Sequence, residues 1–264
     1  MRYLTLDGED LRQEYGAWFV HKYTFLHSTP ARTVNRQESS RRHGSGFSGG
    51  KWQTNETGQV TMSITDVDPA TGMRGGYPQL SANEEAVKAR FLRVDRPILI
   101  AELFDDEAWP KTGRQASCEV TREVDHTPTG LTYSELVFRV DVIDAFWRDV
   151  NEQVEVAPFS LLRGGSAPIV DAGILIPGTG APAYRVTDNV TGKWIEWSGS
   201  VPSGQWVRLD PLNETGWQVT SESFEGGTEK PGLVRTGAGG FEIHPTVDLT
   251  TPTGTKIAAR RAFL

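Results

Sequence analysis

The most constraining feature of the sequence is the stretch Leu136–Asp149, LVFRVDVIDAFWRD, near the middle of the chain. Apolar residues occupy every second position of its first half, and Arg139 and Asp141 lie between them. This alternation is typical of a strand with one buried face, because successive side chains point to opposite sides. It ends at Ala145-Phe146-Trp147, and after Glu155 the composition shifts toward Gly, Pro, Thr and Trp. We interpret the stretch as the last strand of a first domain, with an aromatic pair at the junction with a second.

The length and composition favour two turn-rich globular domains, which we place at residues 1–150 and 151–264. The chain has 264 residues, 28 of them Gly and 15 Pro, and a domain takes roughly 150 residues.

The net charge of −7 disfavours binding of nucleic acid through a basic surface, which needs clustered Lys and Arg. No apolar run approaches the roughly 18 residues of a membrane helix, and we recognise no secretory leader. We therefore expect a protein that is soluble and intracellular at synthesis and has no membrane partner.

In the first half, strand patterns and a single helical pattern predict a β-sheet domain that carries one helix. The helical pattern is Ser81–Leu92, in which Ser81 and Glu84 have the spacing of a capping box. Its predicted buried face consists of Ala86, Val87, Arg90 and Phe91. Asp7-Gly8 predicts a tight turn at the start of the chain. The predicted strands are Arg2–Leu6, Trp18–Leu26, Gln59–Asp66, Ile98–Leu103, and a hairpin of Gln115–Val124 with Ser134–Ile143.

In the second half, short strands recur about every ten residues between Gly, Pro and Asn turns, a spacing that predicts an antiparallel β-sandwich. No helix is evident after residue 150. The predicted fold class is therefore mainly β, with one helix in the first domain. The predicted strands are Ala167–Pro177, Ala183–Asp188, Lys193–Trp197, Gln205–Asp210, Gly216–Val219, Gly240–His244 and Lys256–Leu264.

The segment Thr33–Gly58 is polar and shows no period, and six of the seven residues in Gly44–Gly50 are Gly or Ser. A long loop without secondary structure in a compact domain is usually functional or disordered. We favour an arm that becomes ordered against a neighbouring subunit, which would supply the contacts that it lacks in its own chain. The basic run at 41–43 can also be read as a local anion site, although such residues are more often simply solvated. The residues predicted to make subunit contacts are Arg41, Arg42, Phe47, Lys51 and Trp52.

The sequence offers no catalytic or metal-binding pattern. The acidic pair Glu84-Glu85 lies in a helical turn and Asp105-Asp106-Glu107 in a predicted turn, and both have ordinary structural explanations. No nucleophile elbow, zinc-protease, phosphate-loop or Ca²⁺-loop spacing is present. The single cysteine, Cys118, excludes an intramolecular disulfide, and its apolar neighbours predict a small buried residue. We expect no enzyme and no cofactor.

Four tryptophans in the second half raise the alternative of a carbohydrate-binding module, because exposed aromatic faces stack on pyranose rings. Trp194 and Trp197 lie three positions apart in one strand and so face opposite sides of the sheet. We therefore rank packing in the core or in subunit contacts above sugar binding. A glycosidase or peptidase is a further alternative, which would need two carboxylates, or a nucleophile and its base, to converge in one cleft. The sugar-stacking candidates are Trp194, Trp197, Trp206 and Trp217.

The order of these elements resembles the distal tail protein family of long-tailed phages, often labelled minor tail proteins in phages of actinobacteria. The resemblance covers nearly the whole chain. It includes the opening LDGEDLRQEYG, the single helix, the FWRD junction, and the segment GSAPIVDAGILIPGTGAPAYRVTDNVTGKWIEWSG followed by SGQWVRLDP. The motifs are loose and contain no catalytic signature. The segments Thr33–Gly58 and Glu225–Gly240 depart from a minimal member of the family.

The resemblance implies a fold and a function. The first domain would form a hexameric ring that continues the tail tube, and the second would be a galectin-like sandwich that projects outward. The ring would join the tube to the tip or baseplate, contact the tape-measure protein and other tip or hub proteins, and pass DNA during ejection without binding it specifically. An acidic chain suits a lumen that repels DNA. The expected location is the tail tip of the virion, after assembly in the host cytoplasm.

Overall fold

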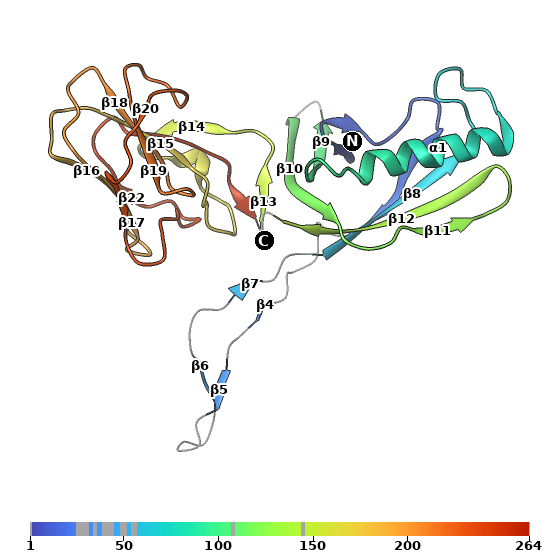
Figure 1. The fold of residues 1–264 in the computed structure, drawn as a ribbon, viewed down its shortest axis with the longest axis horizontal. Coiled ribbons are helices and arrows are strands. Elements are labelled where there is room, and N and C mark those ends of the chain that lie inside the picture. The colour runs from blue at the N-terminus through green and yellow to red at the C-terminus, as the bar shows by residue number, and fades with distance from the viewer. Residues whose placement is uncertain are drawn as a thin grey trace. The chain divides into compact units, whose positions relative to one another are not determined.

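The computed structural model describes residues 2–24, 32–33, 36–38, 45–47, 52–53, 57–106, 109–143 and 146–263 (Figure 1). The chain forms two compact units, Met1–Trp147 and Arg148–Leu264. All described strand pairs are antiparallel, and α1 (Gly76–Phe91) is the one α-helix of the described residues. The predicted fold class, mainly β with a single α-helix, is confirmed. Within the described residues, no helix is long and apolar enough to span a membrane.

The first unit is built on one antiparallel sheet with the strand order β2-β1-β9-β10-β12-β8-β3, and β11 pairs with β12. Its strands are β1 (Arg2–Leu6), β2 (Glu9–Asp10), β3 (Trp18–Tyr23), β8 (Thr57–Thr65), β9 (Ile98–Asp106), β10 (Trp109–Val120), β11 (Asp125–Pro128) and β12 (Tyr133–Val142).

The predicted turn at Asp7-Gly8 joins β1 to β2. Both residues have positive φ, 53° and 87°, as the tight turns of two-residue hairpins require. Asp7 is held in this rarely populated conformation by its carboxylate. One oxygen accepts a 3.0 Å hydrogen bond from the Leu99 amide, and the other lies 3.0 Å from the Arg93 guanidinium. The turn is thereby fixed to the start of β9.

The sheet buries the apolar face of β12 beneath α1, which lies along one side of the sheet (Figure 1). Leu136, Phe138, Val140 and Val142 are almost fully buried, and the residues between them are partly exposed. Phe138 stacks on Phe91 of the helix with ring centroids 4.0 Å apart. The period-2 interpretation of this stretch is confirmed. Cys118 is also buried, as its sequence context predicts.

The helix begins five residues before the predicted Ser81, so the prediction of a capping box is wrong. Gly75 is the N-cap, and no side chain caps it. Instead, the carboxylate of Asp66 accepts a 3.2 Å hydrogen bond from the Gly76 amide in the first turn. Pro78 is tolerated there because the backbone N–H groups in the first turn of a helix have no hydrogen-bond acceptor within the helix. The buried residues are Leu80, Asn83, Val87 and Phe91, whereas the predicted Ala86 is exposed.

The predicted hairpin of Gln115–Val124 with Ser134–Ile143 is correct only in part. β10 and β12 pair over three residues, from Cys118 to Val120. Beyond that point, β11 takes the place of β10 beside β12 and pairs with it from Asp125 to Pro128. The hairpin partner of β12 is therefore β11, and β10 pairs along most of its length with β9.

The polar segment at 33–58 contains strands, contrary to the expectation of a loop without secondary structure. These are β4 (Arg32–Thr33), β5 (Arg36–Glu38), β6 (Ser45–Phe47) and β7 (Trp52–Gln53). β4 pairs with β7, and β5 pairs with β6, both antiparallel. The described strands of this segment therefore pair with one another.

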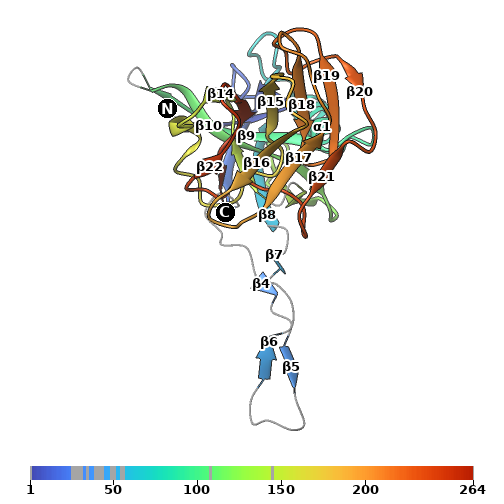
Figure 2. The ribbon, with the colours of Figure 1, turned by 90° about the vertical axis from the view of Figure 1, so that its left-hand side faces the viewer.

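The second unit consists of two antiparallel sheets that share a core (Figure 2). One has the strand order β14-β23-β15-β18-β19-β20 and the other β21-β17-β16-β22. Their strands are β14 (Gln153–Val156), β15 (Gly173–Pro177), β16 (Ala183–Asp188), β17 (Trp194–Ser198), β18 (Trp206–Asp210), β19 (Thr215–Val219), β20 (Thr228–Glu229), β21 (Val234–Thr236), β22 (Leu249–Thr250) and β23 (Lys256–Ala259). In addition, β13 (Trp147–Asp149) pairs with β24 (Ala262–Phe263).

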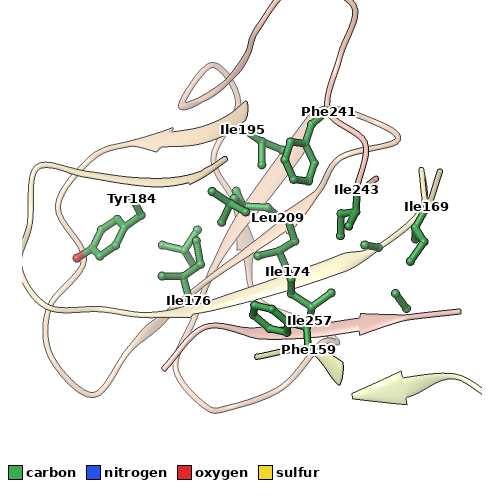
Figure 3. Close-up of a cluster of buried hydrophobic side chains, with 14 of the residues drawn as sticks. Phe159, Ile169, Ile174, Ile176, Tyr184, Ile195, Leu209, Phe241, Ile243 and Ile257 are labelled. Carbon is green, nitrogen blue, oxygen red and sulfur yellow. The ribbon is translucent and has the colours of Figure 1, made fainter. Parts of the chain in front are cut away.

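Side chains from both sheets fill the core of the second unit (Figure 3). Ile174 and Leu209 come from the six-stranded sheet, and Tyr184 and Ile195 from the four-stranded sheet. The buried Tyr184 hydroxyl donates to the Val201 carbonyl at 3.0 Å and accepts from the Thr179 amide at 2.9 Å. The predicted antiparallel sandwich is therefore present.

Three predicted strands of the second half are shorter, divided or absent. Lys256–Leu264 is divided into β23 and β24. β15 begins at Gly173, so the first residues of Ala167–Pro177 lie outside it. Gly240–His244 forms only an isolated bridge, between Ile169 and Ile243. The glycine at 240 has φ of 72°, which is incompatible with an extended strand at that position. After residue 150, the described residues contain one short 3₁₀ helix, η2 (Ser160–Leu162), and no α-helix.

Replacing Asn83 by Ala should destabilise the first unit. Asn83 is 2% exposed, and its amide nitrogen donates to the carbonyls of Thr65 and Val67, at 2.8 Å each. The variant leaves both carbonyls without this donor, so we expect a loss of about 1–3 kcal/mol in the free energy of unfolding. Urea denaturation measures it. Glu85→Ala, at an exposed position of the same helix, is the control, and equal losses in the two variants would contradict the expectation.

Candidate functional site

The candidate site is a cavity of about 490 Å³ in the second unit. It lies where β18 and β19 turn their polar sides outward. In β18, Val207 and Leu209 belong to the core, so Arg208 and Asp210 point to the opposite side of the sheet. The strand register places Trp217 of β19 directly opposite Arg208. The Arg208 guanidinium carbon lies 3.9 Å from the centroid of the Trp217 ring, a stacked cation–π arrangement.

Small residues form one side of the cavity. Gly173 of β15 pairs with Ala258 of β23, and both line the cavity. A Cβ atom at Gly173 would lie 3.2 Å from the ring of Phe224, which is tighter than nine in ten such contacts. Because Gly173 has no side chain, the Phe224 ring can pack directly over the sheet at this position.

The segment 221–227 is fastened across this side of the sheet at two points. Arg208 donates a 2.8 Å hydrogen bond to the main-chain carbonyl of Phe224. Lys256 of β23 forms an ion pair with Glu222. The segment then turns at Gly226 and Gly227, whose φ values are 69° and 98°. One aromatic wall of the cavity, Phe224, is thus positioned by a loop, and the other, Trp217, by a strand.

Four carboxylates line the cavity, and three of them have protein partners. Asp171 lies 2.6 Å from the guanidinium of Arg148, and Glu152 lies 3.9 Å from that of Arg260. Asp210 accepts hydrogen bonds of 2.7 and 3.2 Å from the side chain and main chain of Asn213. Glu225 is exposed. The site offers acceptors, one guanidinium and two aromatic rings, which suits binding of a polar ligand that has an apolar face.

The four tryptophan candidates do not form one platform. Trp197 is 1% exposed in the core and presents no face to solvent. Trp194 lies on the outer side of the four-stranded sheet beneath Arg185, with the guanidinium carbon 4.3 Å from the ring centroid. Trp206 and Trp217 lie on the outer side of the six-stranded sheet. Of the four, Trp217 alone lines the cavity.

Sequence reasoning missed Phe224, Gly173 and Asp210. Phe224 stands alone in SESFEGG, and nothing local indicates that this segment crosses a sheet. The pairing of Arg208 with Trp217 could have been found, because a β18–β19 hairpin with its turn at 211–214 sets that register.

Two of the five residues predicted for subunit contact lie in described strands. Arg41, Arg42 and Lys51 are outside the described residues. Phe47 is in β6 and Trp52 is in β7, where they pair in register with Arg36 and Thr33.

A second cavity, of about 320 Å³, lies in the first unit beside β1 and β3. Tyr23 borders it and donates a hydrogen bond to Glu102, which is 3% exposed. Arg12 also borders it, and the hydrogen bond from Arg12 to Asp10 raises the pKa of the guanidinium. His21 lines the same cavity. In the described part of the chain, no group of three or more His, Cys, Asp or Glu side chains could hold a metal ion.

Comparison with known proteins bears on the fold. No family model matches the chain, and no curated protein matches it. A crystal structure of the Dit protein of phage SPP1 matches with a TM-score of 0.64 over 100% of both chains, at 15% sequence identity. That protein is described as a paradigm of the hub adsorption apparatus in phages that infect Gram-positive bacteria. The chain shares the fold of SPP1 Dit. The resemblance to distal tail proteins is therefore supported at the level of the fold.

Replacing Trp197 by Ala should destabilise the second unit far more than replacing Trp194 by Ala. Trp197 fills the core, and Gly216 lies against its ring. Its truncation should cost about 3–5 kcal/mol, the usual range for a buried large aromatic residue. Trp194 is only partly buried, so its truncation should cost less. Thermal and urea denaturation of both variants measure the difference, and a greater loss for Trp194→Ala would refute this assignment of the core.

Proposed function

We propose that the protein is a structural component of a phage tail tip. In this proposal it forms a hexameric ring that joins the tail tube to the tip or baseplate and lets DNA pass during ejection. The observation that carries the proposal is the fold shared with SPP1 Dit over the full length of both chains. A likeness confined to one unit would support only a common β-sandwich.

The first unit has features that suit a ring. Within the described residues, β3 pairs with β8 along one edge and has no strand on the other. A free strand edge can pair with a strand of a neighbouring chain. Contacts of the head-to-tail kind close into a ring when the rotation between neighbours allows it. The paired strands β4 with β7 and β5 with β6 would form a second contact with the next subunit.

The partners in this proposal are the tail tube protein, the tape-measure protein and the hub or other tip proteins. DNA would pass through the lumen without specific binding, which agrees with the net charge of −7. The protein would reside in the tail tip of the virion after assembly in the host cytoplasm. The second unit, as a galectin-like sandwich, would project from the ring and carry attachments. The proposal assigns no catalytic role.

The ring can be tested by measuring the molar mass of the purified chain. We expect light scattering across a concentration series to show a six-chain species, alone or after co-expression with the tail tube protein of the same phage. Negative-stain images of that species should show a central hole. A chain that stays monomeric in both preparations would contradict the proposal.

The arm can be tested by shortening it. We expect replacement of residues 36–47 by a short Gly-Ser linker to reduce the hexamer population at least about tenfold, because the loss of one repeated contact acts at every interface. Circular dichroism should show that the sheets remain folded. Leu131→Ser, at an exposed residue in the turn between β11 and β12, is the control and should leave the mass unchanged. A hexamer that forms equally well without these residues would exclude the arm as a subunit contact.

A further inference from the structure

The cavity beside Trp217 and Phe224 has the size and composition of a small-molecule site. Its volume of about 490 Å³ lies in the range of roughly 300–1,000 Å³ that ligand pockets occupy. The aromatic rings of Trp217 and Phe224 lie beside both hydrogen-bond donors and hydrogen-bond acceptors. Arg208 has N–H donors, and Asp210 and Glu225 provide carboxylate acceptors. The site therefore combines apolar contact with hydrogen bonding in both directions.

The charges around the cavity are largely compensated. Asp171 is paired with Arg148, and Glu152 lies near Arg260. Arg208 brings a positive charge to the same cavity as the remaining acidic side chains, Asp210 and Glu225. A strongly cationic ligand would have to compete with arginines already in place, and an anionic ligand would meet several carboxylates. A neutral ligand avoids both costs, since paired carboxylates still accept further hydrogen bonds through their free lone pairs.

We propose that this cavity binds a neutral saccharide. Neighbouring hydroxyl groups of a pyranose would donate to Asp210 and Glu225 and accept from Arg208. The C–H face of the sugar ring would pack on Phe224 and on the part of the Trp217 ring that the stacked Arg208 leaves uncovered. Gly173 keeps the site open, because any side chain there would push against Phe224.

This site differs from the surface around Trp194, which lies on the outer side of the four-stranded sheet. Trp194 is also covered by a stacked arginine, Arg185, but that arginine is paired with Glu196 at 2.8 Å, and neither the ring nor the arginine lines the cavity. The two tryptophans thus share a type of contact and differ in whether they border the cavity. Trp194→Ala is therefore a matched control for Trp217→Ala.

The inference goes beyond a role in a ring and does not depend on it, because every group named belongs to one unit of one chain. The experiment is saturation-transfer NMR on the full chain with a panel of neutral sugars at millimolar concentration. The panel contains glucose, galactose, mannose, N-acetylglucosamine, maltose and lactose. We expect at least one sugar to receive saturation, with an effect that levels off as the concentration of that sugar rises.

The variants locate the binding. Trp217→Ala and Glu225→Gln should each weaken it about tenfold, the effect of losing one aromatic contact or one charge-assisted hydrogen bond. Trp194→Ala should leave it unchanged. Glu225 is exposed, so Glu225→Gln remains informative if Trp217→Ala fails to fold. Absence of saturation transfer to every sugar would overturn the inference, as would binding that survives Glu225→Gln unchanged or is lost in a folded Trp194→Ala. None of these results depends on the oligomeric state.

Discussion

The first unit depends on the alternation of apolar and polar side chains along β12. The alternating residues Leu136, Phe138, Val140 and Val142 are buried on one side of the strand, and Phe138 stacks on Phe91 of the helix. A shift of the strand by one residue would turn all of these side chains to the other side of the sheet. The fixed register also places Ser134 and Tyr133 opposite Ile64 and Thr65 of β8. Burial of the helix, the position of β8 and the extent of β11 all follow from this one strand.

The second unit shows how a sandwich leaves its outer surfaces available. The inner sides of both sheets are used entirely for the core, which includes the hydrogen-bonded Tyr184 and the large ring of Trp197. The outer side of the four-stranded sheet carries a stack of Arg185 on Trp194. The outer side of the six-stranded sheet is crossed by a loop, and this crossing, together with the glycine beneath it, creates a cavity. The core of such a fold thus constrains little of what its outer surfaces bind.

Sequence patterns were informative wherever the determining contacts are local. The limits of β16, Ala183–Asp188, agree with the pattern of the residues themselves, and the turn at Asp7-Gly8 follows from its two residue types. The start of the helix could not be predicted, because the group that receives its first amide is Asp66, ten residues away. The cavity depends on contacts between β15, β18 and the loop that carries Phe224, which lie far apart in the chain. No single window of sequence contains that information.

The hydrogen bond from Arg208 to the loop has an evolutionary consequence, because it ends on the main-chain carbonyl of Phe224. Every amino acid presents the same carbonyl, so the anchor persists whichever residue occupies position 224. Substitutions can therefore accumulate along this loop while its path over the sheet is kept. Related chains that conserve Arg208 and Gly173 could diversify the residues of this loop and so change the surface that borders the cavity. The Arg208 guanidinium belongs to the sheet and holds the main chain of the loop, so the side chains of the loop can vary without loss of this anchor.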